Sequence, residues 1–303
     1  MKVLLTGATG FLGRNLEPIL SAHHEVTATG SKDCDLRSTE EIDNTLHKTQ
    51  PDVVVHAAGV VGGIGANKDN PGKFLYENLM MGSNLIHRSM INKVPKFILL
   101  GTVCAYPKFA PVPFKEDDLW NGYPEETNAP YGVAKKALME MLIAYCKQYG
   151  MNGTNLIPVN MYGPHDHFNL TSSHVIPALI LKVRDAIENK SPSISVWGTG
   201  QVSREFLYAE DCAKAIQLAI EKDTGPQPIN IGTGVETKIY EVVEQICNVM
   251  GYEGDVMYDT SKPDGQPRRC LDTSRAKKLL GFEASTDLKS GLAKTIEFFN
   301  LKS

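Results

Sequence analysis

Apolar residues along the first half of the chain follow two alternating patterns. Short runs that are apolar throughout and rich in β-branched residues are typical of strands buried on both faces of a parallel sheet. Between these runs, apolar residues return every three or four positions, which is helical spacing. The two patterns predict strands at 2–6, 25–29, 52–57, 96–101 and 153–159 and helices at 11–20, 39–48, 71–92 and 130–148. Strands that alternate with helices predict a parallel sheet covered by helices on both faces.

The alternation becomes less regular after Asn160. Residues 163–173 are polar and loop-like, and shorter elements are expected after them, with strands at 194–198, 205–208, 228–231 and 255–259 and helices at 175–189, 210–222, 238–250, 273–280 and 287–299. We therefore predict an α/β protein with a Rossmann-type, doubly wound parallel sheet in residues 1–160. A smaller, mixed α/β lobe is expected in residues 161–303, and it can add strands and helices back to the main domain.

The composition excludes several classes of protein. Hydrophobic residues make up 42% and charged residues 22% of the 303 residues, and the net charge is −4. This is an ordinary soluble composition without the basic surface that nucleic acid binding requires. No apolar run approaches the ~20 residues that span a bilayer, and Thr6 and Gly7 interrupt the apolar start too early for a signal peptide. The six cysteines form no C-x-x-C pair, so we expect a reduced, cytoplasmic protein.

A glycine-rich turn follows the first predicted strand. Gly7, Gly10 and Gly13 stand three residues apart between this strand and the next helix, which is the context that a dinucleotide-binding motif requires. The first glycine permits a tight turn, the second lets the backbone approach a pyrophosphate, and the third lets the helix pack on the sheet. The helix N-terminus then offers free N–H donors to the phosphates. A turn that only needs flexible residues is the alternative interpretation.

The end of the second predicted strand bears on the choice between NAD and NADP. An acidic residue at this position would bind the ribose 2′-hydroxyl of NAD. Here Ser31 and Lys32 come first, Asp33 follows late, and Arg14 opens the helix beside the same pocket. Hydroxyls and cations suit a 2′-phosphate, so the pattern favours NADP(H). The alternative is that Lys32 and Arg14 are solvated surface charges.

Tyr131 and Lys135 stand four residues apart in a predicted helix, so they share one helical face. A free tyrosine has a pKa of roughly 10, and a nearby ammonium is expected to lower it into the range of acid–base catalysis. Tyr-x-x-x-Lys is a short pattern that also occurs by chance. Its weight here comes from the glycine-rich turn upstream and from Thr102 and Cys104 between the two motifs.

These motifs together resemble the extended short-chain dehydrogenase/reductase superfamily. More specific segments resemble the GDP-L-fucose synthase family over nearly the whole chain, namely VVGGIGAN (60–67), CAYP (104–107), NAPYGVAKKA (128–137), MYGPHDHF (161–168), SHVIPAL (173–179), VWGTGQVSREFLY (196–208), NIGTGVE (230–236) and SKPDGQPRR (261–269). The resemblance implies an NADP-dependent 3,5-epimerase and 4-reductase that acts on GDP-4-keto-6-deoxy-D-mannose.

The resemblance assigns the reduction to three residues. Tyr131 would protonate the C4 oxygen during hydride transfer, and Lys135 would hold the nicotinamide ribose and lower the tyrosine pKa. Thr102 falls where the family usually has serine, and its hydroxyl would orient the sugar carbonyl and the tyrosine. For Thr102 taken alone, a strand-end hydroxyl that bonds to the backbone is the alternative.

The resemblance assigns the epimerisation to Cys104 as the base and His174 as the acid. A C–H group beside the C4 ketone is acidic, so a thiolate on one face and an acid on the other can invert the carbon. Taken singly, Cys104 is more often a small buried hydrophobe, and His174 is more often a helix N-terminal residue that bonds to the backbone.

The resemblance also implies the binding residues. Cofactor contacts would come from Gly7, Thr9, Gly10, Phe11, Leu12, Gly13, Arg14, Ser31, Lys32, Leu100, Gly101, Lys135, Pro158, Asn160, Met161 and His174. Contacts to the GDP-sugar would come from Lys182, where arginine is usual, and from Trp197, Arg204, Asp264 and Arg269. His165 and His167 form an H-x-H pair, but no further ligands are evident, so we expect no metal site.

Three other readings stay open. The chain could act on a related GDP-4-keto sugar, such as one in a GDP-colitose or GDP-heptose pathway, because one missing hydroxyl changes few contacts. It could be a reductase without epimerase activity, or a non-catalytic NADP sensor, although it keeps both Tyr131 and Lys135. The resemblance further suggests a homodimer that pairs the helices at 73–92 and 130–148 in a four-helix interface.

Overall fold

The computed structural model describes residues 1–169, 173–262 and 264–301, and within them a six-stranded parallel sheet forms the centre of the molecule. Its strand order is β2-β1-β3-β4-β5-β10. The strands are β1 (Lys2–Thr6), β2 (Glu25–Thr29), β3 (Val53–His56), β4 (Lys96–Leu100), β5 (Asn152–Pro158) and β10 (Pro228–Ile231). Most residues of β1, β3 and β4 are buried, because helices cover both faces of the sheet.

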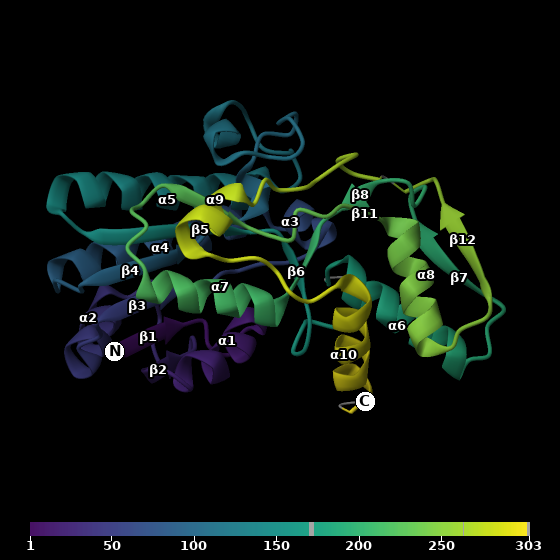
Figure 1. The fold of residues 1–303 in the computed structure, drawn as a ribbon, viewed down its shortest axis with the longest axis horizontal. Helices are drawn as coiled ribbons and strands as arrows, with labels where there is room; N and C mark the ends of the chain where they lie inside the picture. Colours follow the sequence, from purple (N-terminus) through teal and green to yellow (C-terminus); the bar gives the residue numbers. More distant parts are fainter. Residues whose placement is uncertain (170–172, 263, 302–303) are drawn as a thin grey trace.

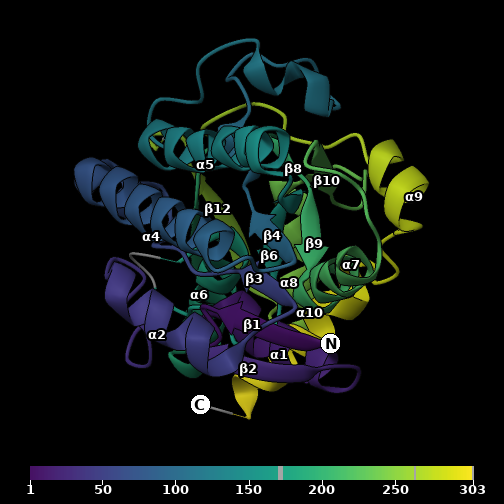
Figure 2. The same cartoon turned by 90° about the vertical axis from the view of Figure 1, so that its left-hand side faces the viewer.

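Two sets of helices cover the sheet (Figure 2). One face carries α2 (Thr39–Thr49), α4 (Pro71–Ile91) and α5 (Ala129–Tyr149), and the other carries α1 (Phe11–Ser21) and α7 (Ala209–Glu221). The connections from β1 and from β3 therefore leave toward opposite faces. In doubly wound sheets, ligands bind outside the carboxyl ends of the strands at such a switch point. The predicted doubly wound parallel sheet is confirmed.

The second lobe has a hydrophobic core of its own, to the right of the main sheet in Figure 1. Its helices are α6 (Val175–Glu188), α8 (Ile239–Met250) and α10 (Leu288–Asn300). Short strands pair within it or at its border: β7 (Ser193–Trp197) with β12 (Asp255–Asp259), β6 (Asn160–Tyr162) with β9 (Phe206–Tyr208), and β8 (Ser203–Arg204) with β11 (Thr237–Lys238).

The chain returns to the first lobe twice. After β9 it forms α7, which packs against α1, and then β10, which pairs with β5 at the edge of the main sheet. Helix α9 (Ser274–Leu280) packs beside β10. The second half of the chain thus adds a strand and helices to the main sheet, as its patterns allowed. Segments 203–205 and 267–269 are hydrogen-bonded to each other, since the Ser203 N–H donates to the Pro267 carbonyl and the Glu205 N–H to the Arg269 carbonyl.

Several short elements escaped the sequence patterns. They are α3 (Ile64–Asp69), β6, β8, β11 and two 3₁₀ turns, η1 (Val103–Ala105) and η2 (Glu116–Trp120). Each is too short to display a period, so only its tertiary contacts define it. The turn η1 matters most, because it follows β4 and carries Cys104.

Candidate active site

The glycine-rich turn forms a tight cradle at the switch point. Gly7 has φ +77°, a conformation that favours glycine, and a Cβ there would lie 2.6 Å from the Ala58 backbone after β3. A Cβ on Gly13 would lie 2.2 Å from the Gly7 carbonyl oxygen. Helix α1 begins after Gly10 with no side-chain cap and no acidic residue in its first turn. Its N–H groups are therefore available to an anion, which fits a dinucleotide pyrophosphate.

The turn after β2 lies against this cradle. A Cβ on Gly30 would lie 2.7 Å from the Thr9 side chain, and the Arg14 Nε donates to the Thr9 carbonyl at 3.0 Å. The Asp33 Oδ2 accepts from the Gly30 N–H at 2.8 Å, so this carboxylate closes the turn. Ser31 and Lys32 are exposed at the same turn.

Tyr131 and Lys135 are both buried on one face of α5. The Lys135 Nζ donates to the Leu100 carbonyl at the end of β4 at 3.0 Å, and burial lowers the lysine pKa to about 8. Burial raises the pKa of Tyr131 well above its usual value, negative charge on Cys104 raises it further, and a hydrogen bond with Thr102 opposes both.

The expectation that Lys135 lowers the tyrosine pKa is therefore wrong for this arrangement. Desolvation disfavours the phenolate more than the surrounding groups favour it. Tyr131 keeps its proton at neutral pH, and this is the form in which a tyrosine can act as an acid. Lys135 contacts a backbone carbonyl at the carboxyl end of β4.

Thr102 and Cys104 reach Tyr131 because a helix and a turn approach closely. Thr102 follows β4, and its Oγ1 accepts from the Cys104 N–H at 3.2 Å. A Cβ on Gly132 would lie 2.3 Å from the Cys104 carbonyl oxygen, so only glycine lets α5 pack so near η1. The structure thus brings the four predicted residues Thr102, Cys104, Tyr131 and Lys135 to one edge of the sheet.

Two arginines from the second half of the chain lie near this cluster. Arg269 is buried and Arg204 is half-buried. The Arg269 Nη1 lies 3.7 Å from the Cys104 Sγ, and its Nε and Nη2 donate to the Gln266 Oε1 at 3.3 and 3.1 Å. Burial, followed by the charge of Arg269, lowers the pKa of Arg204 to about 10. The Arg269 guanidinium therefore places a positive charge beside the Cys104 sulfur.

The other predicted substrate residues lie near the end of β7, and the Asp264 carbonyl accepts from the Arg204 Nη2 at 3.2 Å. The Lys182 Nζ donates to the Ser195 carbonyl at 2.8 Å and lies 5.6 Å from the centre of the Trp197 ring. Trp197 is 63% exposed, which leaves its ring accessible to a base. Asp264 is already engaged, because its two carboxylate oxygens accept from the backbone and the hydroxyl of Thr199 at 2.7 and 2.8 Å.

The residues after β5 include more of the predicted cofactor contacts. Pro158 ends β5, and Asn160 and Met161 begin β6, which leads to the second lobe. The Asn160 Nδ2 donates to the Glu205 carbonyl at 3.0 Å, so this amide also holds β9 in place. His174 is the N-cap residue of α6, and surrounding atoms and the charge of His167 lower its pKa although the ring is open to solvent.

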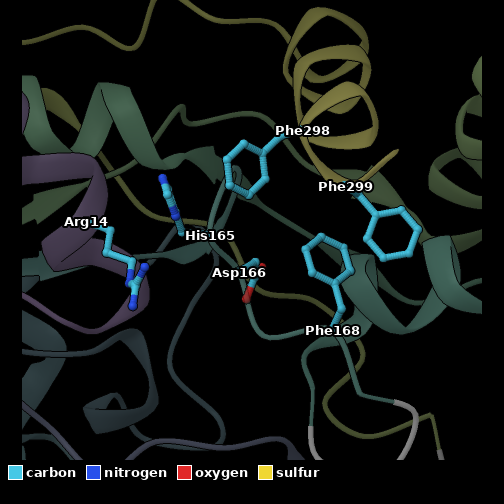
Figure 3. A pocket seen from close by; sticks show the side chains of 6 residues that line it. All are labelled: Arg14, His165, Asp166, Phe168, Phe298 and Phe299. Atoms are coloured by element: carbon cyan, nitrogen blue, oxygen red, sulfur yellow. The ribbon is translucent and has the colours of Figure 1, made fainter. Parts of the chain in front are cut away.

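A cavity of about 170 Å³ lies between the start of α1, the loop after β6 and the end of α10 (Figure 3). Its lining residues are Arg14, His165, Asp166, Phe168, Phe298 and Phe299. Asp166 is 8% exposed, and its Oδ2 has no hydrogen-bond partner in the described part of the chain. Burial raises the pKa of this carboxyl to about 7. No group of three or more metal-ligating side chains occurs in residues 1–169, 173–262 and 264–301.

The raised pKa of Asp166 predicts a pH-dependent stability. The folded state holds a proton that the unfolded state releases above about pH 4, so this stabilisation is lost as the pH rises through about 7. A shift of about three units corresponds to at most about 4 kcal/mol. We expect Asp166→Asn to lose less stability than wild type between pH 5 and pH 8 in thermal melts. The exposed Asp69→Asn should follow wild type, and identical pH dependence in all three proteins would contradict the prediction.

The chain is similar to known proteins over nearly its whole length. Residues 3–232 match the NAD dependent epimerase/dehydratase family. The chain is 40% identical to a GDP-L-fucose synthase of Sinorhizobium fredii, covering 98% of this chain and 95% of that protein. It is 39% identical to a GDP-L-colitose synthase of Yersinia pseudotuberculosis, covering 99% and 98%. The solved structure of a GDP-L-fucose synthetase from Naegleria fowleri bound to NADP superposes with a TM-score of 0.90 at 27% identity, covering 99% and 94%.

Proposed function

Because the chain belongs to the NAD dependent epimerase/dehydratase family, we propose that it is an NADPH-dependent 3,5-epimerase and 4-reductase that converts GDP-4-keto-6-deoxy-D-mannose to GDP-L-fucose. The observation that carries the proposal is the meeting of Thr102, Cys104 and Tyr131 at the end of β4. At this position, the Tyr131 phenol for the reduction and the Cys104 thiol for the epimerisation would face the same sugar.

The residues present fit the cofactor. The glycine cradle and the uncapped start of α1 suit the pyrophosphate, and bound NADPH would supply the hydride. The Asp33 carboxylate is engaged, because it accepts a hydrogen bond from the Gly30 N–H. Ser31 and Lys32 lie exposed in the same turn, and Arg14 bonds to the Thr9 carbonyl beside it. This arrangement supports a 2′-phosphate rather than a free 2′-hydroxyl, and hence NADPH rather than NADH.

In the reduction, the C4 carbonyl carbon gains a hydride and its oxygen gains the Tyr131 proton. Tyr131 keeps this proton at neutral pH because of its burial, and its hydrogen bond with Thr102 points the hydroxyl toward the end of β4. Thr102 would also orient the ketone oxygen. Lys135, held on the Leu100 carbonyl, would place the ribose of the cofactor.

In the epimerisation, the Cys104 thiolate removes a proton from C3 or C5, and the electron pair of that C–H bond moves toward the C4 oxygen. His174 returns a proton on the opposite face, which inverts the carbon. Arg269, whose Nη1 lies 3.7 Å from the sulfur, places a positive charge beside this base. Lys182 and Trp197 would bind the GDP portion, with the ring beside the base and the ammonium beside the phosphates.

Product analysis tests the proposal. The protein is incubated with GDP-4-keto-6-deoxy-D-mannose and either NADPH or NADH, oxidation is followed at 340 nm, and the product is identified by NMR. We expect turnover with NADPH, slower turnover with NADH, and a product inverted at C3 and C5. Turnover only with a dideoxy or heptose ketosugar would instead favour a related pathway, as in the colitose synthase relative. Tight NADPH binding without any turnover would favour a sensor.

We also propose a homodimer formed through α4 and α5. These helices lie side by side on one face of the sheet (Figure 2). They expose several large apolar side chains, namely Leu75, Tyr76, Ile91 and Tyr149. A second copy of the pair would complete a four-helix interface.

No described helix is long and apolar enough to cross a membrane. The six cysteines are free, which supports a cytoplasmic location, where thiols stay reduced.

A further inference from the structure

A buried carboxylate joins the segments that carry the two arginines. Glu205 stands next to Arg204, between β8 and β9, and is 0% exposed. Its Oε1 accepts from the Thr233 and Gly234 N–H groups, the latter at 2.8 Å, and its Oε2 accepts from the Leu271 N–H at 2.7 Å. Both oxygens are therefore occupied by backbone donors, which makes these charge-assisted bonds short and directional.

The bonds of Glu205 run in different directions through the fold. Thr233 and Gly234 follow β10 and so belong to the edge of the main sheet. Leu271 lies two residues after Arg269, and the Arg269 carbonyl accepts from the Glu205 N–H at 3.1 Å. A Cβ on Gly232 would lie 2.1 Å from the Glu205 Oε1, so the chain leaves room for this carboxylate only with glycine there.

We infer that Glu205 is a positioning residue of the reaction centre, because its carboxylate fixes the segment of Arg269 to the main sheet and thereby holds the Arg269 guanidinium beside the Cys104 sulfur. The main sheet also carries Thr102 and Cys104 at the end of β4. One acceptor thus sets the distance between the thiol on one lobe and the cation that approaches it from the connecting segment.

Several titratable or charged groups surround the Cys104 thiol, and the position of Glu205 affects one of them. Tyr131 faces the thiol from α5, Arg269 from the segment after Gln266, and Arg204 from β8. Glu125, before α5, also acts on Arg204. Arg269 is the cation with a contact to the sulfur, and a cation beside a cysteine increases its reactivity, so moving the Arg269 backbone should slow alkylation at a given pH.

The test measures Cys104 in the full chain without substrate. The rate of alkylation by iodoacetamide is followed by mass spectrometry from pH 6 to pH 10 in wild type and in Glu205→Gln. Glutamine keeps one acceptor but turns an NH₂ group toward a backbone N–H, so the bonds cannot all form. The pH at which the alkylation rate is half-maximal is compared between the two proteins. This pH does not change when a substitution only makes the sulfur more accessible to the reagent.

The control is a second buried carboxylate with the same local chemistry. Asp211 is 1% exposed and accepts from the Ser285 and Thr286 N–H groups at 3.2 and 2.8 Å, on a helix of the other sheet face. Asp211→Asn should lower the melting temperature as Glu205→Gln does, while its alkylation profile stays with wild type. We expect the Glu205→Gln alkylation profile to move to higher pH by about one unit, because the Arg269 cation is no longer held beside the sulfur.

Superimposed profiles in Glu205→Gln and wild type would overturn the inference and leave Glu205 a structural residue. Should Glu205→Gln fail to fold, Glu205→Asp keeps the charge but is too short to reach both sides, and it should show the same shift. The catalytic meaning of the inference rests on the proposed role of Cys104. The alkylation profile tests the positioning separately, because it needs no turnover, whereas a missing turnover in wild type would count against the proposed function alone.

Discussion

Replacing Tyr131 with phenylalanine is expected to slow reduction of the ketone by about 10²- to 10⁴-fold, the usual contribution of a positioned general acid. The change removes one oxygen from a side chain that is only 8% exposed, so the packing of α5 stays nearly the same. Without the phenol, the forming alkoxide loses the proton donor that the proposal assigns to it. Oxidation of NADPH at 340 nm under single-turnover conditions measures the effect.

The same variant should keep two other properties. Binding of NADPH should stay within about twofold of wild type, because the cradle of Gly7 and Gly13 is untouched. Exchange of solvent deuterium into C3 and C5 should continue, because Cys104 remains. Ketone reduction at the wild-type rate in Tyr131→Phe would reject the proposed acid and require another proton donor.

Replacing Cys104 with serine is expected to reduce deuterium exchange at C3 and C5 by at least about a hundredfold. A hydroxyl is a far weaker acid than a thiol, so a serine supplies far less of the anion that removes the C–H proton. The oxygen still fits the half-buried position and Thr102 still bonds to the backbone at residue 104. Exchange is followed by NMR of the nucleotide sugar in D₂O.

A matched control is available on helix α5. Cys146 is also half-buried and reduced, but it lies at the far end of the helix from Tyr131. Cys146→Ser should keep both exchange and reduction, and Cys104→Ser should keep NADPH binding. Undiminished exchange at C3 and C5 in Cys104→Ser would assign the base to another residue.

The fold was predictable because its signals are local. Val53, Val54 and Val55 form a continuous apolar run that suits only a strand covered on both faces, and the structure buries all three. The spacing of Gly7, Gly10 and Gly13 likewise predicted the turn between β1 and α1. Such patterns act within one element, so the sequence shows them without knowledge of the neighbours.

The chemistry around the candidate site was only partly predictable. The four-residue spacing of Tyr131 and Lys135 placed both on one helical face, but the direction of the tyrosine pKa shift was wrong. Burial decides that shift, and burial depends on β4 and η1, which are distant in the sequence. Asp166 and Glu205 gave no signal at all, because a single acidic residue in a loop or a short strand has no pattern to detect.

By itself, the sequence determined the alternation of strands and helices, the glycine cradle and the helical face shared by Tyr131 and Lys135, since each depends on residues a few positions apart. Only the tertiary structure decided that Arg269 lies 3.7 Å from the Cys104 sulfur and that Glu205 joins three distant segments. Charges act through space and desolvation acts through surrounding atoms, and both are set by how the lobes pack rather than by the order of residues.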